Sequence, residues 1–118
     1  MVGGMDVEEV RRFALSLPEA TEEPHFESAS FRIRGRIFAT LPPDGEHLHV
    51  FVDQDEARAV AAGEGPAFEE LWWGEKLAGA RVHLPSIETP DLLVELIEDA
   101  WRRKAPKRVV AAFDADRR

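Results

Sequence analysis

The feature that most constrains the fold of this 118-residue chain is a long amphipathic segment near the C-terminus. Thr89-Pro90 is typical of a helix start, because proline is favoured at the first helical position. The apolar residues that follow recur with the helical period and form one wide stripe. They are Leu92, Leu93, Leu96, Ile97, Ala100 and Trp101. A helix with such a stripe must bury it against another layer of the domain.

The centre of the chain supplies strands for that layer. A β-hairpin is predicted around the turn Arg34-Gly35, because apolar and polar residues alternate on both sides of it. A two-residue turn would pair Phe31 with Phe38, and a three-residue turn would pair Ile33 with Ile37. The second register gives cleaner alternation, but both stay open.

The remaining elements follow from caps and periodicity. Asp6 with Glu9, and Asp53 with Glu56, have the capping-box spacing that predicts two further helix starts. A short helix is also expected after Pro106. The predicted strands are the hairpin over residues 28–41 and segments 47–52 and 81–84, whereas 19–27 is interpreted as a loop and 65–79 shows no clear pattern. The predicted core contains Val10, Phe13, Leu17, Leu93, Leu96, Ile97 and Trp101.

Length and composition predict one globular domain. The sequence divides into a flexible N-terminus (1–5), a single domain (6–114) and a short tail (115–118). The chain has no cysteine, which excludes disulfides, thiolate catalysis and cysteine-ligated metal centres. No apolar stretch approaches the roughly 18 residues that a membrane span needs. We therefore expect a cytoplasmic protein with no membrane partner.

Charge is distributed unevenly along the chain. The net charge is −8, which argues against nucleic-acid binding by bulk attraction. Nevertheless, residues 31–41 carry three arginines and no acid, and residues 100–118 carry seven bases against two acids. Arginines outnumber lysines by twelve to three, which favours planar, bidentate contacts if these two basic segments bind a ligand.

Two stretches resemble a known family. Pro24-His25-Phe26 followed by residues 30–39 (SFRIRGRIFA) is similar to the signature hairpin of the MmcQ/YjbR family. Residues 100–108 (AWRRKAPKR) resemble that family's C-terminal helix and the break that follows it. The resemblance implies an α+β domain with a frataxin-like (CyaY-like) fold, in which a twisted antiparallel β-sheet has helices packed on one face. Members of this family are often labelled DNA-binding by analogy between folds, which specifies no chemistry.

The basic segments give the leading hypothesis for a binding site. Arg32, Arg34 and Arg36 flank the predicted turn and would present a basic wing to phosphates. Lys107 and Arg108, with Lys104 beside them, would add a second contact if the fold brings both segments together. The alternative is that these arginines keep an exposed hairpin soluble and pair with nearby acids.

Other constellations point to chemistry more weakly. His47 and His49 share one face of a predicted strand, with Asp53 nearby, and such a set can bind a divalent metal. A half-exposed strand explains the same pattern, so we expect no metal site and no cofactor. There is no nucleophile elbow and no catalytic triad at a recognisable spacing, so we expect no catalytic residues and no enzyme.

The aromatic residues suggest a second surface. Trp72 and Trp73 are adjacent in a chain that lacks tyrosine, and neighbouring side chains point apart. One of them is therefore expected on a ligand or partner surface. His25 in the family-like motif is a further candidate for this surface, although burial with a backbone hydrogen bond also explains it. The sequence thus predicts a non-enzymatic binding module whose leading ligand is DNA. The first alternative is a module that binds a protein or a small ligand, and the second is a metal-binding, frataxin-like protein.

Overall fold

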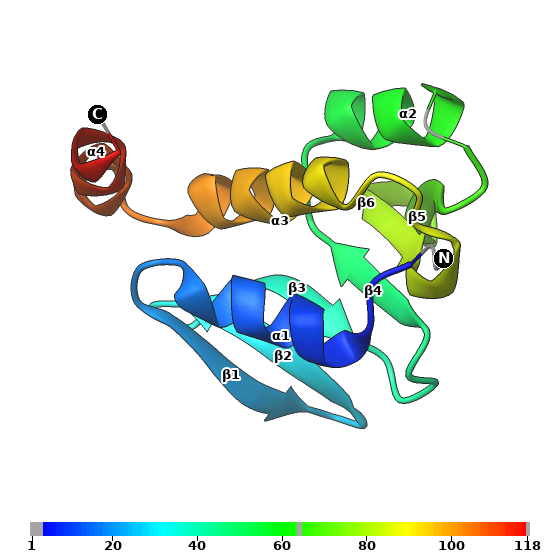
Figure 1. The fold of residues 1–118 in the computed structure, drawn as a ribbon, viewed down its shortest axis with the longest axis horizontal. Helices are drawn as coiled ribbons and strands as arrows, with labels where there is room; N and C mark the ends of the chain where they lie inside the picture. The colour runs from blue at the N-terminus through cyan, green and yellow to red at the C-terminus, as the bar shows by residue number, and fades with distance from the viewer. Residues whose placement is uncertain (1–3, 64, 118) are drawn as a thin grey trace.

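The computed structural model describes residues 4–63 and 65–117, and these form an α+β domain around one antiparallel sheet (Figure 1). The six strands lie in the order β1-β2-β3-β4-β6-β5. The elements in chain order are α1 (Val7–Ser16), β1 (Ala20–His25), β2 (Ser28–Ile33), β3 (Arg36–Leu41), β4 (His47–Val50), α2 (Gln54–Gly63), β5 (Phe68–Trp73), β6 (Lys76–His83), the short 3-10 helix η1 (Leu84–Ser86), α3 (Pro90–Lys104) and α4 (Lys107–Asp116).

Two of the helices cover one face of the sheet. α1 and α3 lie side by side in front of the strands, and α2 packs against β5 and β6 (Figure 1). The apolar stripe of α3 is buried as predicted, with Leu93, Leu96 and Ile97 at most 1% exposed. The main core joins this stripe to α1 and to apolar residues of the strands. Of the predicted core residues, Phe13 is only partly buried and the others are buried.

The hairpin turns at Arg34-Gly35 as predicted. Both residues have positive φ, of 53° and 80°, as a tight two-residue turn between twisted strands requires. Its register matches neither of the two predicted pairings, because a bulge at Phe31/Arg32 shifts the partner of Phe31 from Phe38 to Ala39. Phe31, Phe38 and Ala39 all lie in the core.

Two strands were missed by the sequence analysis. The predicted loop 19–27 contains β1, an edge strand whose Pro24 and acidic residues hide the pattern of a strand. Residues 65–79 contain β5, the opposite edge, and the first half of β6. A bulge between Leu71 and Trp72 breaks the alternation in β5 and gives it a spacing that resembles a helix.

Close packing between β6 and the end of β4 needs a glycine. A Cβ atom on Gly79 would lie 2.1 Å from the carbonyl oxygen of Val50, which is closer than side chains approach. The chain leaves β4 at this point and turns into α2, whose start is capped by a hydrogen bond from the Glu56 amide to the Asp53 carboxylate (2.8 Å). This crossing shapes one wall of the pocket described below. Among the described residues, no helix has both the length and the hydropathy needed to span a membrane.

Candidate functional site

The face of the sheet opposite the main core carries a continuous polar row. Residues paired across neighbouring strands lie on the same face, so the strand registers define which side chains line up. One such row takes a polar residue from each of the six strands: Glu23, Ser30, Thr40, His49, Arg81 and Glu69. The adjacent row on the covered face contains Phe31, Ala39, Val50 and Ala80. We call the first surface the polar face.

At both ends of this row, polar side chains interact with a neighbouring residue of the same row. Ser30 Oγ donates to the carbonyl oxygen of Glu23 (2.8 Å), and Arg81 pairs with Glu69 (3.0 Å). In the middle, His49 Nε2 is buried and has no hydrogen-bond partner among the described residues. Burial, followed by the nearby positive charge of Arg81, lowers the pKa of His49 below its usual range. His49 is therefore neutral near pH 7, and its buried, unpartnered nitrogen carries a desolvation cost.

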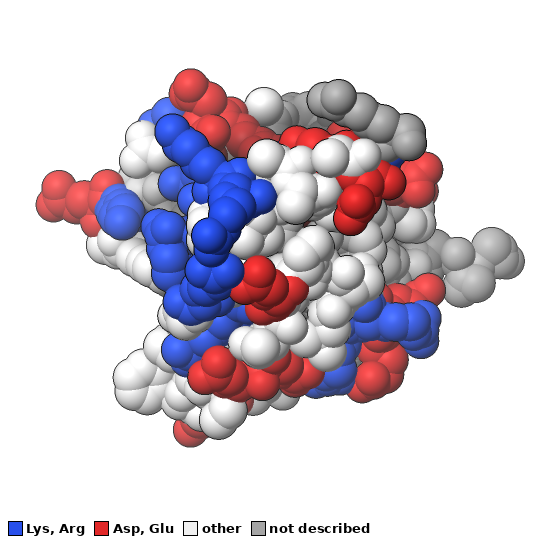
Figure 2. All heavy atoms as spheres, turned by 90° about the vertical axis from the view of Figure 1, so that its left-hand side faces the viewer, with Lys and Arg blue, Asp and Glu red and all other residues white. Residues whose placement is uncertain are grey.

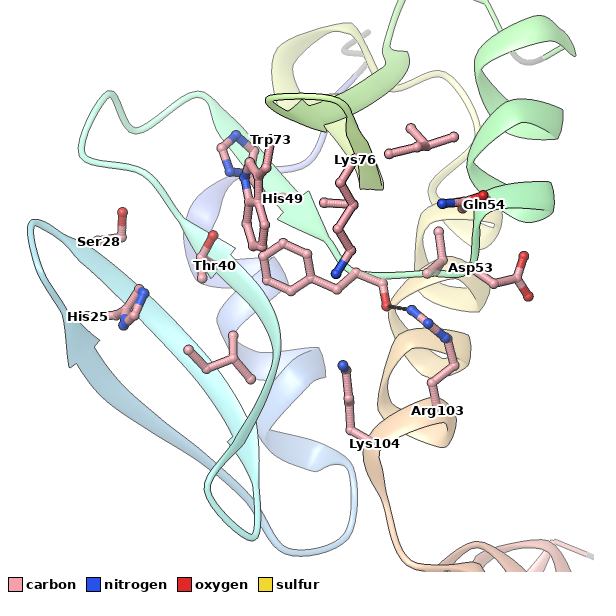
Figure 3. Close-up of a pocket in the computed structure, with 15 residues that line it drawn as sticks. His25, Ser28, Thr40, His49, Asp53, Gln54, Trp73, Lys76, Arg103 and Lys104 are labelled. Carbon is pink, nitrogen blue, oxygen red and sulfur yellow. Dashed lines mark hydrogen bonds between the residues drawn. The ribbon is translucent and has the colours of Figure 1, made fainter.

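A pocket of about 550 Å³ opens over this part of the polar face (Figure 3). Its volume is in the range of about 300–1,000 Å³ that is usual for small-molecule sites. His25 and Ser28 enter from the β1–β2 hairpin, where they are paired across the turn. Thr40 and His49 form the floor from β3 and β4. Trp73, in contact with Phe51 at a ring distance of 5.1 Å, adds an aromatic wall.

Three cations, Lys76, Arg103 and Lys104, line this pocket, and Arg36 bonds to the backbone of Lys104 beside it. Burial lowers the pKa of Lys104, and the positive charges of Arg103, Arg36 and Lys76 lower it further. Lys76 and Lys104 point toward one another across the pocket, from β6 and α3 (Figure 3). Arg36 Nη1 donates to the carbonyl oxygen of Lys104 (3.0 Å), and Arg103 Nη1 donates to that of Phe51 (2.6 Å). We call these four residues the cation cluster.

The cation cluster forms no close ion pairs among the described residues, although the charge of Arg103 acts on the nearby Glu56 and Asp53 also lines the pocket. Within residues 4–63 and 65–117, none of its members forms an ion pair with an acidic side chain, whereas Arg81 and Arg102 do. Figure 2 shows lysine and arginine side chains gathered in a band over the side of the molecule where α3 ends and α4 lies, with acidic residues at its edges. Uncompensated cations repel one another, so this arrangement favours an anionic ligand.

The two basic segments of the sequence do meet. The contact between Arg36 and Lys104 joins the β2–β3 hairpin to the end of α3, and Lys107 and Arg108 follow, exposed, at the start of α4. The arginines of the predicted wing behave differently from one another. Arg34 makes two hydrogen bonds to Glu19 (2.6 and 3.2 Å). Arg32 bonds to Ser30 Oγ (2.9 Å), so Arg36 alone of the three joins the cation cluster.

The predicted aromatic surface is divided by the structure. Trp72 is 48% exposed and Trp73 is 55% exposed, but only Trp73 lines the pocket, together with His25. Trp72 Nε1 donates to Glu70 (3.0 Å). His25 is half-buried and its ring contacts Phe26 (4.8 Å), so burial with a backbone hydrogen bond does not describe it.

The histidines considered for a metal have other contacts. His47 and His49 share a face, as predicted. His47 Nδ1 lies 2.6 Å from Asp44, and its ring contacts His83 (5.0 Å). Asp53 caps α2 instead. In the part of the chain that the structure describes, no group of three or more possible ligands has a geometry suited to a metal ion.

Comparison with known families identifies the chain. The family model for YjbR matches residues 15–103, which is most of the chain. The protein belongs to the YjbR family. Among solved structures, it is similar to the crystal structure of Deinococcus radiodurans protein DR2400, a DUF419 domain, which is an older name for the same family. The TM-score is 0.69 at 20% identity, over 81% of this chain and 75% of that chain. None of the curated proteins matches.

The family resemblance noted in the sequence is thereby confirmed, but its motifs did not reveal the whole site of this YjbR protein. Lys76, Arg103 and Thr40 were not singled out, because their role depends on strand register and on where α3 ends. One signal was present for Lys76: Gly74-Glu75, between Trp73 and Lys76, has the composition of a two-residue hairpin turn.

Proposed function

We propose that this YjbR protein is a non-enzymatic module that binds DNA through the cation cluster and the adjacent start of α4. The observation that carries the proposal is the group Arg36, Lys76, Arg103 and Lys104, none of which forms an ion pair with a carboxylate of the described residues, in an acidic protein. Phosphate contacts supply most of the affinity in sequence-independent binding to DNA. Lys107 and Arg108 follow in the sequence at the start of α4, where they are exposed, and Arg108 lies near Glu19.

The net charge of −8 does not prevent such binding. Electrostatic interactions are screened over about 8 Å at physiological ionic strength, so a ligand at the surface responds mainly to nearby charges. The end of α3, which carries Arg103 and Lys104, lies on a side where basic side chains form a band (Figures 1 and 2). Arg32 and Arg34 are expected to contribute less, because Glu23 and Glu19 lie beside them.

A small anionic ligand is a second candidate, which the size of the pocket favours. The two functions differ in how binding depends on strand length. DNA that spans several cations gains affinity with each added phosphate contact, whereas a small ligand fills the pocket without a strand. The frataxin-like fold that the resemblance implies also remains a prediction, and a metal-binding role of that kind remains the least favoured alternative.

The test is a titration of DNA at several salt concentrations. With about four phosphate contacts, the plot of log affinity against log salt should have a slope of about −3 to −4. The double substitution Lys76→Ala/Lys104→Ala removes two contacts and should flatten the slope by about 1.5 to 2. The substitution Arg36→Ala should act in the same direction.

The control is Arg34→Ala/Arg58→Ala, which removes the same formal charge from arginines that already pair with Glu19 and Asp55. It should change the slope by much less than the lysine pair does. No binding at about 50 mM salt, or equal effects of the two double variants, would contradict the proposal. Tight binding of a mononucleotide that does not improve with strand length would favour the small-ligand function.

A further inference from the structure

We propose that the pocket on the polar face holds one unstacked base of a single DNA strand, with the base against Trp73 and its phosphates on the cation cluster. This inference rests on the proposed function and specifies the form of DNA that the site takes. It follows from the position of an aromatic wall, polar side chains and cations around one cavity.

Trp73 is well placed to stack with a base. It is 55% exposed, and its ring contacts Phe51, which is only 8% exposed and anchors that wall. Every base offers a flat aromatic face, so a fixed tryptophan next to cations is a typical surface for a single strand. A base within a duplex is stacked on its neighbours and cannot enter such a cavity without being turned out.

The floor of the pocket offers hydrogen-bonding groups for the edge of a base. His49 lines the cavity, and a neutral histidine ring can donate or accept a hydrogen bond. Thr40 and Ser28 line the same cavity, and their hydroxyl groups can also do either (Figure 3). These groups suit the mixed donors and acceptors of a base better than they suit a purely apolar ligand.

The cations lie where the strand on either side of that base would run. Lys76 and Lys104 point across the mouth of the pocket, and Arg103 lies beside Lys104 (Figure 3). Arg36 Nη1 donates to the carbonyl oxygen of Lys104. A base on Trp73 therefore leaves its flanking phosphates among four positive charges. The site combines a base pocket with phosphate contacts, and a free phosphate ion would use only the second part.

The experiment compares two strands that carry the same phosphates. Calorimetry with a thymidine strand of about twelve nucleotides, and with an equally long strand of abasic sugar-phosphate units, isolates the contribution of the bases. Stacking of one base predicts that the thymidine strand binds about 5- to 100-fold more tightly. Trp73→Ala should abolish this difference, and Trp73→Phe should restore part of it.

Trp72→Ala is the matched control, because Trp72 is adjacent and similarly exposed but does not line the pocket. The difference between the strands should persist in that variant. Equal binding of both strands to the unaltered protein would overturn the base pocket while leaving the proposed function intact. A difference that survives Trp73→Ala would also overturn it. Failure of both strands to bind would contradict the proposed function itself, and the base pocket with it.

Discussion

The two faces of the sheet use the same six strands for different purposes. On the covered face, Phe31, Val50 and their neighbours meet α1 and α3, and their side chains are fully buried. On the polar face, the row from Glu23 to Glu69 is polar in every strand, and its centre lies under a pocket. The difference shows that the main core uses one face of this small sheet, whereas the other face carries a polar row and a pocket.

The contrast extends to how polar groups are satisfied. Trp101 in the core donates its indole N–H to the carbonyl oxygen of Pro18 (3.0 Å), as buried polar groups usually do. His49 on the polar face has a buried nitrogen without a partner among the described residues. Lys104 is likewise held among three other cations. Stability alone favours neither arrangement, and a ligand that is polar and anionic would compensate for both.

The largest loss of stability should come from truncating a buried side chain on the covered face. Leu96 is 1% exposed within the stripe of α3, so Leu96→Ala should lower the free energy of unfolding by about 2–5 kcal/mol, through lost burial and the cavity left behind. The partly exposed Trp73 on the other side should tolerate truncation much better. Urea denaturation of both variants measures the comparison. A larger loss for Trp73→Ala than for Leu96→Ala would show that the two faces are not divided in this way.

A smaller change in stability is expected from substituting Glu56, where α2 approaches α3. Burial, followed by a hydrogen bond to Asp99 and the negative charge of that residue, raises the pKa of Glu56 to about 8. The ordinary value is 4.5, so the folded state binds more protons than the unfolded state between these pH values. Linkage then requires the contribution of this group to stability to fall as pH rises from about 4.5 to 8.

Glu56→Gln removes this titration. The variant should unfold at a higher temperature than the unaltered protein at pH 8.5, and the gap should shrink toward pH 5. Thermal unfolding followed by circular dichroism across this range measures it, with Asp55→Asn as the control because Asp55 is exposed at the start of the same helix. A pH dependence that Glu56→Gln leaves unchanged would contradict the assignment.

The sequence predicted those parts of the fold that local chemistry determines. The capping box at Asp6 and Glu9 forms with both of its hydrogen bonds. The helix starting at Pro90 and the turn at Arg34-Gly35 also form as expected. Each of these features depends on a few neighbouring residues, so their spacing is enough to indicate them.

The site was harder to predict because it depends on register. The bulges at Phe31/Arg32 and Leu71/Trp72 shift the pairing by one residue, and nothing in the local pattern marks them. Without the register, Thr40 and His49 cannot be placed opposite one another. The pairing of Arg34 with Glu19, fifteen residues away, could not be predicted from the local sequence either. The sequence did indicate two basic segments, and the contact between Arg36 and Lys104 shows that they meet.

The central claim is that the polar face and its cation cluster form the binding surface of this YjbR protein. The most direct measurement is a two-dimensional ¹H–¹⁵N NMR titration with a short thymidine strand at about 50 mM salt. The account predicts that the perturbed signals gather around the pocket, at Thr40, His49, Lys76, Lys104 and the indole N–H of Trp73. Signals from the solvent side of α1 should stay unchanged. Perturbations confined to Arg34 and α1, or none at all, would contradict the claim.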